Sequence, residues 1–177
     1  NVKIVNDGKK LLGTGGAIYK TKNLLKKNFY VMYGDSYLNL KLKNLKLDKE
    51  SSVMAIFKNN NRYDKSNIEL KKFNYINYHV KINNKKLNYI DYGISYLNQK
   101  IFKNCKENHK FDLSLLFKDI SKKNMLKGVI VKKRFYEIGS YKGIKDLKKF
   151  LEKKLNLQIY TLKILYNHFK KLMKTKY

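Results

Sequence analysis

The sequence predicts an α/β fold whose sheet is largely parallel, and two features of the chain support that prediction. Continuous apolar runs typical of buried strands occupy residues 29–33 (Phe-Tyr-Val-Met-Tyr) and 52–57 (Ser-Val-Met-Ala-Ile-Phe). Amphipathic segments typical of helices occupy residues 17–27 and 111–123. Strands that alternate with helices build the layered α/β architecture. A length of 177 residues fits one domain with its own core.

The first elements are predicted in this order. Residues 2–5 (Val-Lys-Ile-Val) form a short strand, and a glycine-rich loop at 7–16 leads from it into the first helix. The run at 29–33 is apolar on both faces, which predicts a central, parallel strand. Residues 38–47 alternate Leu with Lys or Asn, which leaves helix and loop open. Because the chain starts at Asn1 directly before its first predicted strand, we expect the fold to be incomplete at its N-terminus.

The remaining elements continue the alternation. In order, we expect a turn at 59–61, a small antiparallel hairpin at 66–78, a strand at 89–97, a helix at 111–123, a strand at 128–138 and a helix at 143–154. Together the elements predict a Rossmann-like, mostly parallel sheet flanked by helices, with the hairpin as a local antiparallel addition.

The last stretch, 155–177, predicts an extra, amphipathic C-terminal helix. Leu155, Ile159 and Leu162 begin an apolar series at helical spacing, and lysines occupy the other face. The helix could bind a membrane surface or a partner, or it could pack on its own domain or on a second copy of the chain. We favour the second interpretation, because lysine occurs throughout the sequence, and a homo-oligomer is left open.

Charge dominates the composition without identifying a partner. The formal net charge is +28, from 41 Lys plus Arg against 13 Asp plus Glu. Such a chain suggests nucleic-acid binding, yet only Arg62 and Arg134 are arginine, the residue that usually reads bases and grips phosphates. Asn (21) and Tyr (15) are also abundant and Pro is absent, which indicates a codon bias toward A and T. We therefore expect no specific nucleic-acid partner.

Several classes of protein are excluded by composition. A single cysteine, Cys105, excludes a disulfide scaffold and a zinc cluster. An apolar content of 43%, with 14% aromatics, is too high for a disordered chain. No apolar run approaches the ~20 residues of a membrane span, and no secretory leader is visible. We therefore expect a cytoplasmic, globular protein, in which the histidines and the cysteine form no catalytic pattern.

Glycine is scarce, so its positions are informative. Three of the nine glycines crowd one segment, which consists of Leu12, Gly13, Thr14, Gly15 and Gly16. Such a loop lets the backbone approach a ligand and aims amide groups at an anion near a helix N-terminus. It lacks the Gly-Lys-Ser/Thr of a Walker loop and the third spaced glycine of a dinucleotide fingerprint. The alternative is a tight strand-to-helix turn, which needs fewer glycines.

Two carboxylates follow predicted strands. Asp35 comes directly after the run at 29–33, and Glu137 lies near the end of the strand at 128–138. Ligands of open α/β sheets bind at the carboxyl ends of the strands, and Mg²⁺ takes one or two carboxylates plus substrate phosphates. We therefore expect Asp35 and Glu137 to bind Mg²⁺. A turn cap for Asp35 and a surface position for Glu137 are the alternatives.

The motifs, taken together, resemble one family. Five motifs occur in the order found in sugar-1-phosphate nucleotidyltransferases: Leu-Gly-Thr-Gly-Gly-Ala at 12–17, Phe-x-Val-x-x-Gly-Asp-Ser at 29–36, Arg62-Tyr63 with Glu69 shortly after, Tyr-Ile-Asp-Tyr-Gly-Ile at 89–94 and Tyr-Glu-Ile-Gly-Ser at 136–140. The similarity is to the D-glycero-D-manno-heptose 1-phosphate guanylyltransferase type and runs from about residue 3 to residue 152. It implies an enzyme that transfers a nucleotidyl group from a nucleoside triphosphate to a sugar 1-phosphate and releases pyrophosphate, as in the synthesis of cell-surface polysaccharide precursors.

The resemblance also implies roles for individual residues. The segment 12–16 would lie against the nucleotide, and Asp35 and Glu137 would bind Mg²⁺. The sugar phosphate would be bound by a set of polar residues and one glycine: Glu69, Lys81, Asp91 and Gly93, with Lys85 and Lys86 as alternatives to Lys81. The resemblance divides the chain into a partial nucleotidyltransferase domain at 1–154 and the amphipathic helix at 155–177.

The sequence departs from the family's pattern in three respects. The family's Gly-x-Gly-Thr-Arg loop and the Pro-Lys pair after it do not occur in these 177 residues. Glu137 stands where the family has Asp, and Asp91 where it has Asn. We therefore expect no catalytic residue within this fragment and little or no activity from it alone. A basic nucleic-acid-binding module and a degenerate homologue that binds a sugar nucleotide without turnover are the alternative functions.

Overall fold

The computed structural model describes residues 2–45, 52–81 and 87–174 and divides into two compact units. The first, here called the sheet unit, comprises Asn1–Gly34 and Leu38–Phe135. The second, here called the helix unit, comprises Asp35–Tyr37 and Tyr136–Tyr177. Segments that lie far apart in the sequence therefore build the helix unit together.

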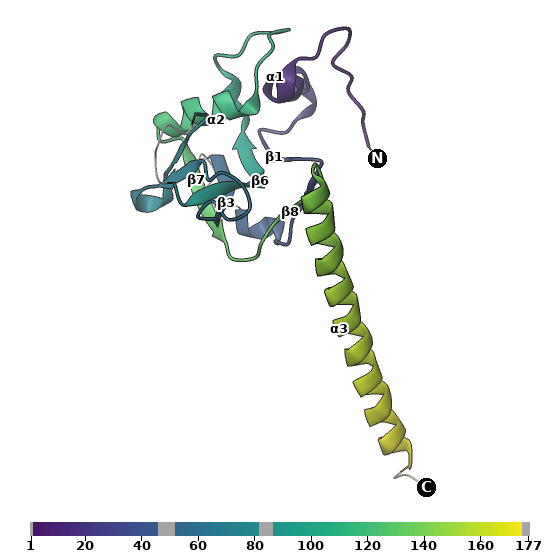
Figure 1. Ribbon diagram of the computed structural model, residues 1–177. Coiled ribbons are helices and arrows are strands. Elements are labelled where there is room, and N and C mark those ends of the chain that lie inside the picture. The colour runs from purple at the N-terminus through teal and green to yellow at the C-terminus, as the bar shows by residue number, and fades with distance from the viewer. Residues whose placement is uncertain (1, 46–51, 82–86, 175–177) are drawn as a thin grey trace. The chain divides into compact units, whose positions relative to one another are not determined.

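The sheet unit contains most of the secondary structure (Figure 1). Its elements are α1 (Gly13–Lys20), η1 (Lys22–Leu24), β1 (Asn28–Met32), η2 (Leu42–Leu45), β3 (Ser52–Lys58), β4 (Ile68–Leu70), η3 (Lys72–Asn74), β5 (Ile76–Tyr78), β6 (Tyr89–Asn98), η4 (Gln99–Phe102), α2 (Leu113–Lys122) and β7 (Leu126–Val131), where η denotes a 3-10 helix. The helix unit contains β2 (Ser36–Tyr37), β8 (Tyr136–Glu137) and α3 (Tyr141–Lys174).

The α/β class is confirmed, but the predicted mostly parallel sheet is wrong. The strands lie in the order β5-β4-β6-β3-β7, and β1 pairs with β6. Among the described strands only β3 and β7 pair in parallel, and all the other pairs are antiparallel. A parallel pair needs a long crossover connection, usually through a helix, and α2 is the helix that precedes β7 here. The predicted hairpin at 66–78 is confirmed as β4 and β5.

The strand predicted at 2–5 is wrong, and the strand predicted at 29–33 is confirmed as β1 but is neither central nor parallel. Residues 2–5 form no strand, and Val2 and Ile4 are 92% and 93% exposed. Among the described strands, β1 pairs only with β6 and in the antiparallel direction, and its Met32 is 58% exposed. An apolar run therefore marked an edge strand here rather than a central one.

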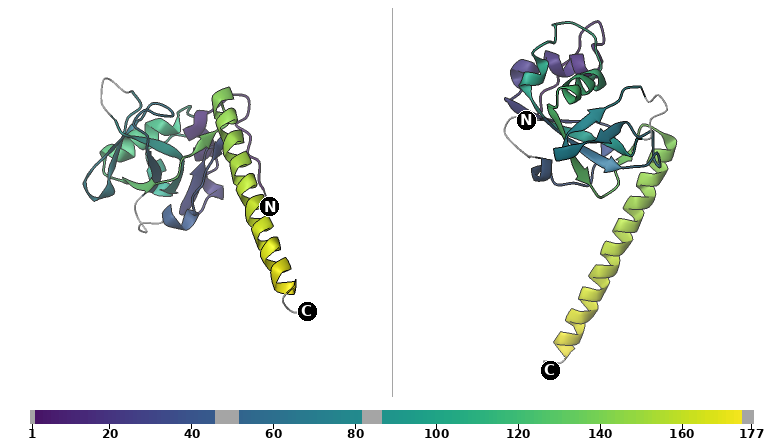
Figure 2. Two further views of the ribbon diagram at one scale, coloured as in Figure 1. Left: turned by 60° about the horizontal axis from the view of Figure 1, so that its bottom comes forward. Right: turned by 90° about the vertical axis from the view of Figure 1, so that its left-hand side faces the viewer.

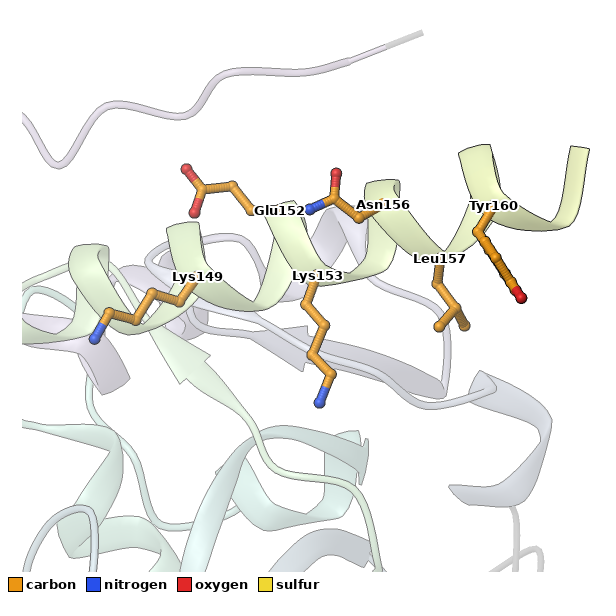
Figure 3. A pocket seen from close by; sticks show the side chains of 6 residues that line it. All are labelled: Lys149, Glu152, Lys153, Asn156, Leu157 and Tyr160. Carbon is orange, nitrogen blue, oxygen red and sulfur yellow. The ribbon is translucent and has the colours of Figure 1, made fainter. Parts of the chain in front are cut away.

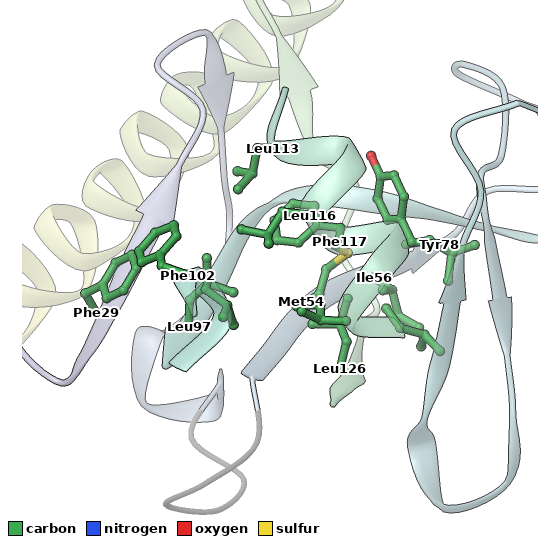
Figure 4. Close-up of a cluster of buried hydrophobic side chains, with 14 residues drawn as sticks. Phe29, Met54, Ile56, Tyr78, Leu97, Phe102, Leu113, Leu116, Phe117 and Leu126 are labelled. Atoms are coloured by element: carbon green, nitrogen blue, oxygen red, sulfur yellow. The ribbon is translucent and has the colours of Figure 1, made fainter. Parts of the chain in front are cut away.

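The main core lies between the sheet and α2 (Figures 2 and 4). Leu116 and Phe117 from α2 meet Met54 and Ile56 from β3, and Leu126 from β7 closes the cluster. A second, smaller cluster on the other face includes Leu45, Ala55, Tyr92 and Ile94. Strand β3 is thus buried on both faces, as its continuous apolar sequence predicts.

The helix unit is built on a short antiparallel ladder. Ser36 pairs with Glu137 and Tyr37 with Tyr136. The ring of Tyr136 stacks on Phe150 of α3, with 4.7 Å between the ring centroids. The predicted strand at 128–138 is therefore two strands, β7 and β8, which belong to different units.

Helix α3 is continuous from Tyr141 to Lys174, so the helices predicted at 143–154 and 155–177 are one element. The division into domains at residue 154 stays a prediction. No helix among the described residues combines the length and the apolarity that a bilayer crossing requires.

Candidate functional site

The two carboxylates predicted to bind Mg²⁺ lie together in the helix unit. A Cβ atom placed on Gly139 would lie 3.2 Å from Oδ2 of Asp35 and 3.3 Å from Oε2 of Glu137. Both oxygens therefore border the same small space beside Gly139. The ladder of β2 and β8 explains their proximity, because Asp35 directly precedes β2 and Glu137 pairs with Ser36. The Asp35 carbonyl also accepts a hydrogen bond from Ile138 N–H at 2.9 Å.

The start of α3 fixes the orientation of Glu137. The Ser140 hydroxyl donates to Oε1 of Glu137 at 2.5 Å and accepts from the Gly143 N–H at 3.0 Å. Ser140 thereby caps the N-terminus of α3, where serine is favoured. A Cβ on Gly143 would collide with the carbonyl and carboxyl oxygens of Glu137. Only glycine allows this approach of the helix to the carboxylate.

The chemistry of the donors fits a magnesium ion. Oδ1 of Asp35 accepts a long hydrogen bond of 3.4 Å from Ser36, and Oε1 of Glu137 is bound by Ser140. Oδ2 of Asp35 and Oε2 of Glu137, which flank Gly139, accept no hydrogen bond from the described residues. Within the part of the chain that the structure describes, no group of three or more His, Cys, Asp or Glu side chains could hold a metal ion. Two carboxylates match Mg²⁺, which completes its shell with water and substrate phosphates.

The glycines at 13–16 are occupied by packing in the sheet unit. They form the first turn of α1, and the N–H groups of Gly15 and Gly16 donate to the carbonyl of Phe111 at 3.0 and 3.1 Å. A Cβ on Gly15 would enter the Phe111 ring, and one on Gly16 would lie 2.8 Å from the carbonyl of His109. The hydroxyl of Thr14 accepts from Leu113 N–H at 2.9 Å. Two of the amides expected to face an anion are therefore engaged within the protein.

Asp91, predicted to bind the sugar, lies in a hydrogen-bonded network. Its Oδ1 accepts from Gly93 N–H at 2.9 Å, and its Oδ2 accepts from the Tyr33 hydroxyl at 3.2 Å. Gly93 adopts a φ of +93° where the register between β3 and β6 shifts, which suits glycine. Burial raises the pKa of Asp91 to about 6, against the lowering effect of these two bonds. Burial, and then the charge of Asp91, raise the pKa of Tyr78.

The other predicted sugar-binding residues lie elsewhere. Glu69 accepts from the Asn77 side chain at 3.1 Å, and its Oε2 is 3.5 Å from Nε2 of His79. Ile68, the neighbour of Glu69 on β4, packs on the α2 side of the sheet, and the register of β4 and β6 places Asp91 on that side as well. Because side chains alternate between the two faces along a strand, Glu69 lies on the opposite face from Asp91.

The structure therefore does not bring Glu69 and Asp91 together. Lys81 is exposed, and Lys85 and Lys86 lie outside the described residues.

One arrangement of charged residues was not predicted from the sequence. Arg62 and Arg134, the two arginines of the chain, both approach the ring of Tyr63, at 5.3 and 3.9 Å from its centroid. Phe57 contacts both Tyr63 and Phe135 beside them. Cation–π contacts of this kind favour arginine over lysine. The scarcity of arginine in the sequence was the available signal.

Comparison with known proteins identifies the fold through structure alone. No family model and no curated protein sequence matches the chain. HddC from Yersinia pseudotuberculosis, a heptose-1-phosphate guanylyltransferase, matches with a TM-score of 0.63 at 24% identity, over 80% of this chain and 64% of that chain. The same protein was also solved in complex with GMP-PN.

Two further structures have the same fold. The inositol-1-phosphate CTP transferase from T. maritima matches with a TM-score of 0.58 at 20% identity, over 75% of this chain and 58% of that chain. The UDP-glucose pyrophosphorylase from Acinetobacter baumannii matches with a TM-score of 0.61 at 12% identity, over 84% of this chain and 64% of that chain. The chain thus spans less than two thirds of the length of each of these structures, and its fold is that of the sugar-1-phosphate nucleotidyltransferases, which confirms the expected resemblance at the level of fold.

Proposed function

We propose that this chain supplies the metal-binding and substrate-binding parts of a Mg²⁺-dependent sugar-1-phosphate nucleotidyltransferase that acts in the cytoplasm, in the synthesis of cell-surface polysaccharide precursors. The observation that carries the proposal is the meeting of the Asp35 and Glu137 carboxylates beside Gly139, in a chain with this fold. Both carboxylates keep one oxygen that accepts no hydrogen bond from the described residues.

The proposed reaction requires positioned charge rather than a covalent nucleophile. An oxygen of the sugar phosphate attacks the α-phosphorus of the nucleoside triphosphate. The bond from that phosphorus to the oxygen that bridges to the β-phosphorus breaks, and pyrophosphate leaves. Asp35 and Glu137 would hold Mg²⁺, which, when bound, offsets the negative charge that builds up on the phosphates. Ser140 and the start of α3 would keep Glu137 in place for this role.

The substrate contacts are proposed for the residues that the family resemblance implies. Leu12, Gly13, Thr14, Gly15 and Gly16 would border the nucleotide, with the amides of Gly15 and Gly16 serving the fold rather than a phosphate. The sugar phosphate would meet Glu69, Lys81, Asp91 and Gly93. Because Glu69 and Asp91 lie on different faces of the sheet, Glu69→Gln and Asp91→Asn should differ in their effect on the KM for the sugar phosphate.

Metal binding is the direct test of the proposal. Mn²⁺, used as a paramagnetic substitute for Mg²⁺, should bind the 177-residue chain in an electron paramagnetic resonance titration. Asp35→Asn and Glu137→Gln should each weaken that binding strongly, since each removes a charged ligand. Glu152→Gln is the matched control, because it neutralises an exposed carboxylate of the same unit. Equal Mn²⁺ affinity in all four proteins would refute the metal site.

Turnover is tested separately. Pyrophosphate release should be measured with the 177-residue chain, and with a longer protein that contains it, across nucleoside triphosphates and hexose or heptose 1-phosphates. Mg²⁺-dependent release by the longer protein supports the enzyme. Binding of nucleotide without release would instead favour a degenerate homologue. The net charge of +28 keeps nucleic-acid binding as the second candidate, and it predicts binding of DNA or RNA that falls steeply with salt.

A further inference from the structure

Helix α3 carries a continuous row of apolar side chains along one face. Those on this face recur at spacings of three and four residues: Ile144, Leu147, Leu151, Leu155, Ile159 and Leu162, here called the apolar stripe. Leu155 and Leu162 are 57% and 65% exposed. The sequence of α3 continues the same spacing with Tyr166, Phe169 and Met173. The stripe follows the described side chains of the helix from Ile144 to Leu162.

The opposite face of α3 is rich in lysine. Figure 3 shows Lys149 and Lys153 on this side, with Glu152, Asn156, Leu157 and Tyr160 around them. From Tyr141 to Lys174 the helix carries ten lysines and two carboxylates, Asp146 and Glu152. Lys148 and Lys154 lie closer to the stripe, where long side chains can carry their charged ends outward. The lysine-rich face also carries Leu157, Tyr160 and Ile164, so the stripe differs from it in its unbroken spacing and not in being the sole apolar part of the helix.

Packing within the helix unit leaves most of the stripe uncovered. Phe150 is the residue of α3 that stacks on Tyr136, and it lies beside the stripe rather than on it. Ile138 and the first part of the stripe line a shallow groove of about 450 Å³. Every described residue from Leu151 to Ile164 is exposed. The helix unit therefore presents a long apolar surface with basic edges.

Charge decides which partner fits this surface. A second copy would bring another helix with ten lysines alongside, and the two carboxylates of each helix are too few to pair with them. An anionic lipid surface would instead attract the lysines, by about 1 kcal/mol for each one close to the headgroups. The apolar stripe would at the same time leave water for the boundary between headgroups and acyl chains, which favours binding.

We propose that α3 binds the surface of an anionic membrane, with the apolar stripe immersed and the lysines at its edges, such as Lys148 and Lys154, reaching the headgroups. The helix would lie along the membrane plane over a length of about 50 Å. This inference is independent of the proposed enzyme activity, because it concerns no residue of the candidate metal site.

The test is vesicle binding by the full chain and two matched double variants. Leu155→Asn with Leu162→Asn changes two leucines of the stripe. Leu157→Asn with Ile164→Asn changes two residues outside the stripe at the same separation, with exposed fractions of 65% and 51%. Both variants keep the net charge of the chain, so they separate the apolar contribution from simple attraction of a basic protein. Circular dichroism checks that both keep their helix content.

The chain should sediment with vesicles of phosphatidylcholine mixed with phosphatidylglycerol and much less with phosphatidylcholine alone. The stripe variant should bind the mixed vesicles about tenfold more weakly, and the control variant should bind within about twofold of the parent chain. Equal losses in both variants, or no binding to the mixed vesicles, would overturn the proposal. So would a dimer in solution that the stripe variant converts to a monomer, since a second copy would then cover the stripe.

Discussion

Two segments of this chain are both rich in glycine, but they need glycine for different physical reasons. At 13–16, the glycines allow the start of α1 to pack against residues 109–112, and two of their amides are bound to the Phe111 carbonyl. At 139–143, the glycines face carboxylates, and Gly143 lies directly against Glu137. In the first segment the Gly15 and Gly16 amides are hydrogen-bonded within the fold. Beside the second, one oxygen of Asp35 and one of Glu137 accept no hydrogen bond from the described residues and can bind a metal ion.

A rare residue can be kept at a position for more than one reason. In both segments the scarce glycines correctly marked places where a side chain cannot fit. Their scarcity could not tell whether the excluded side chain would meet a neighbouring backbone or a ligand-binding group. The hydrogen-bond partners distinguish the two cases: two amides of the segment at 13–16 are bound to the Phe111 carbonyl, whereas the carboxylates beside 139–143 keep oxygens that accept no hydrogen bond from the described residues.

Replacement of Gly143 should have the largest effect. In Gly143→Ala the new methyl group would collide with the carbonyl and carboxyl oxygens of Glu137, so the start of α3 or Glu137 must move. We expect Mn²⁺ affinity in the resonance titration to fall by about 10–100-fold, as when a group that orients a metal ligand is lost. Lys145→Ala, on an exposed position of the same helix, is the control. An unchanged affinity in Gly143→Ala would show that the close approach of α3 to Glu137 is not needed for metal binding.

Replacement of Gly15 should affect stability and leave metal binding unchanged. In Gly15→Ala the methyl group would enter the Phe111 ring, which is overpacking in a buried position. The free energy of unfolding should fall by about 1–3 kcal/mol in urea titrations.

Gly34→Ala is the control for this substitution. Nothing lies within 4 Å of a Cβ placed on Gly34, so its stability should change by about 0.5 kcal/mol or less. A loss of nucleotide binding by Gly15→Ala, at unchanged stability, would show that Gly15 makes room for a ligand and not for the Phe111 ring.

Local sequence patterns predicted the elements better than their arrangement. The apolar run of β3, the hairpin of β4 and β5 and the amphipathic helix α2 were predicted, because each is encoded by the spacing of neighbouring residues. The direction of strand pairing was not predicted, since an apolar run looks the same in a parallel and an antiparallel pair. The position of β1 at an edge depends on β6, which lies about 60 residues later in the chain.

The candidate metal site was predicted by an argument that was only partly correct. Asp35 and Glu137 were expected to meet at the carboxyl ends of parallel strands. They meet instead through the two-residue antiparallel ladder of β2 and β8, which is too short to show in the sequence. The contacts of Arg62 and Arg134 with Tyr63 depend on tertiary structure and could not be read from spacing.

The carboxylates differ in the same way as the glycine segments. Both oxygens of Asp91 accept hydrogen bonds within the fold, whereas Asp35 and Glu137 each keep one oxygen that accepts none from the described residues. Burial raises the pKa of Asp91 from the usual 3.8 to about 6. A carboxyl whose pKa is raised on folding favours the folded state while protonated, and this advantage is lost as the pH rises through about 6. Asp91→Asn should therefore be more stable than the parent chain at pH 8, by roughly 1–2 kcal/mol.

Denaturation of both proteins at several pH values checks this expectation. The difference in the free energy of unfolding should shrink as the pH falls from 8 to 4. Asp119→Asn, a substitution on α2 in the same unit, controls for the general effect of removing a negative charge. A difference that is constant with pH would contradict the raised pKa of Asp91.

Thr14 gives the smallest predicted effect and tests the packing role of its segment most specifically. Its hydroxyl accepts from Leu113 N–H at the start of α2, where the N-cap residue Asp112 makes no capping bond of its own. Thr14→Val keeps the shape of the side chain but removes the acceptor, so the free energy of unfolding should fall by about 1 kcal/mol. Thr21→Val, whose hydroxyl only donates to the Ile18 carbonyl at the end of α1, should cost less. If nucleotide binding fell in Thr14→Val while stability did not, the hydroxyl would bind a ligand and not the start of α2. The segment at 13–16 would then not be explained by packing within the fold.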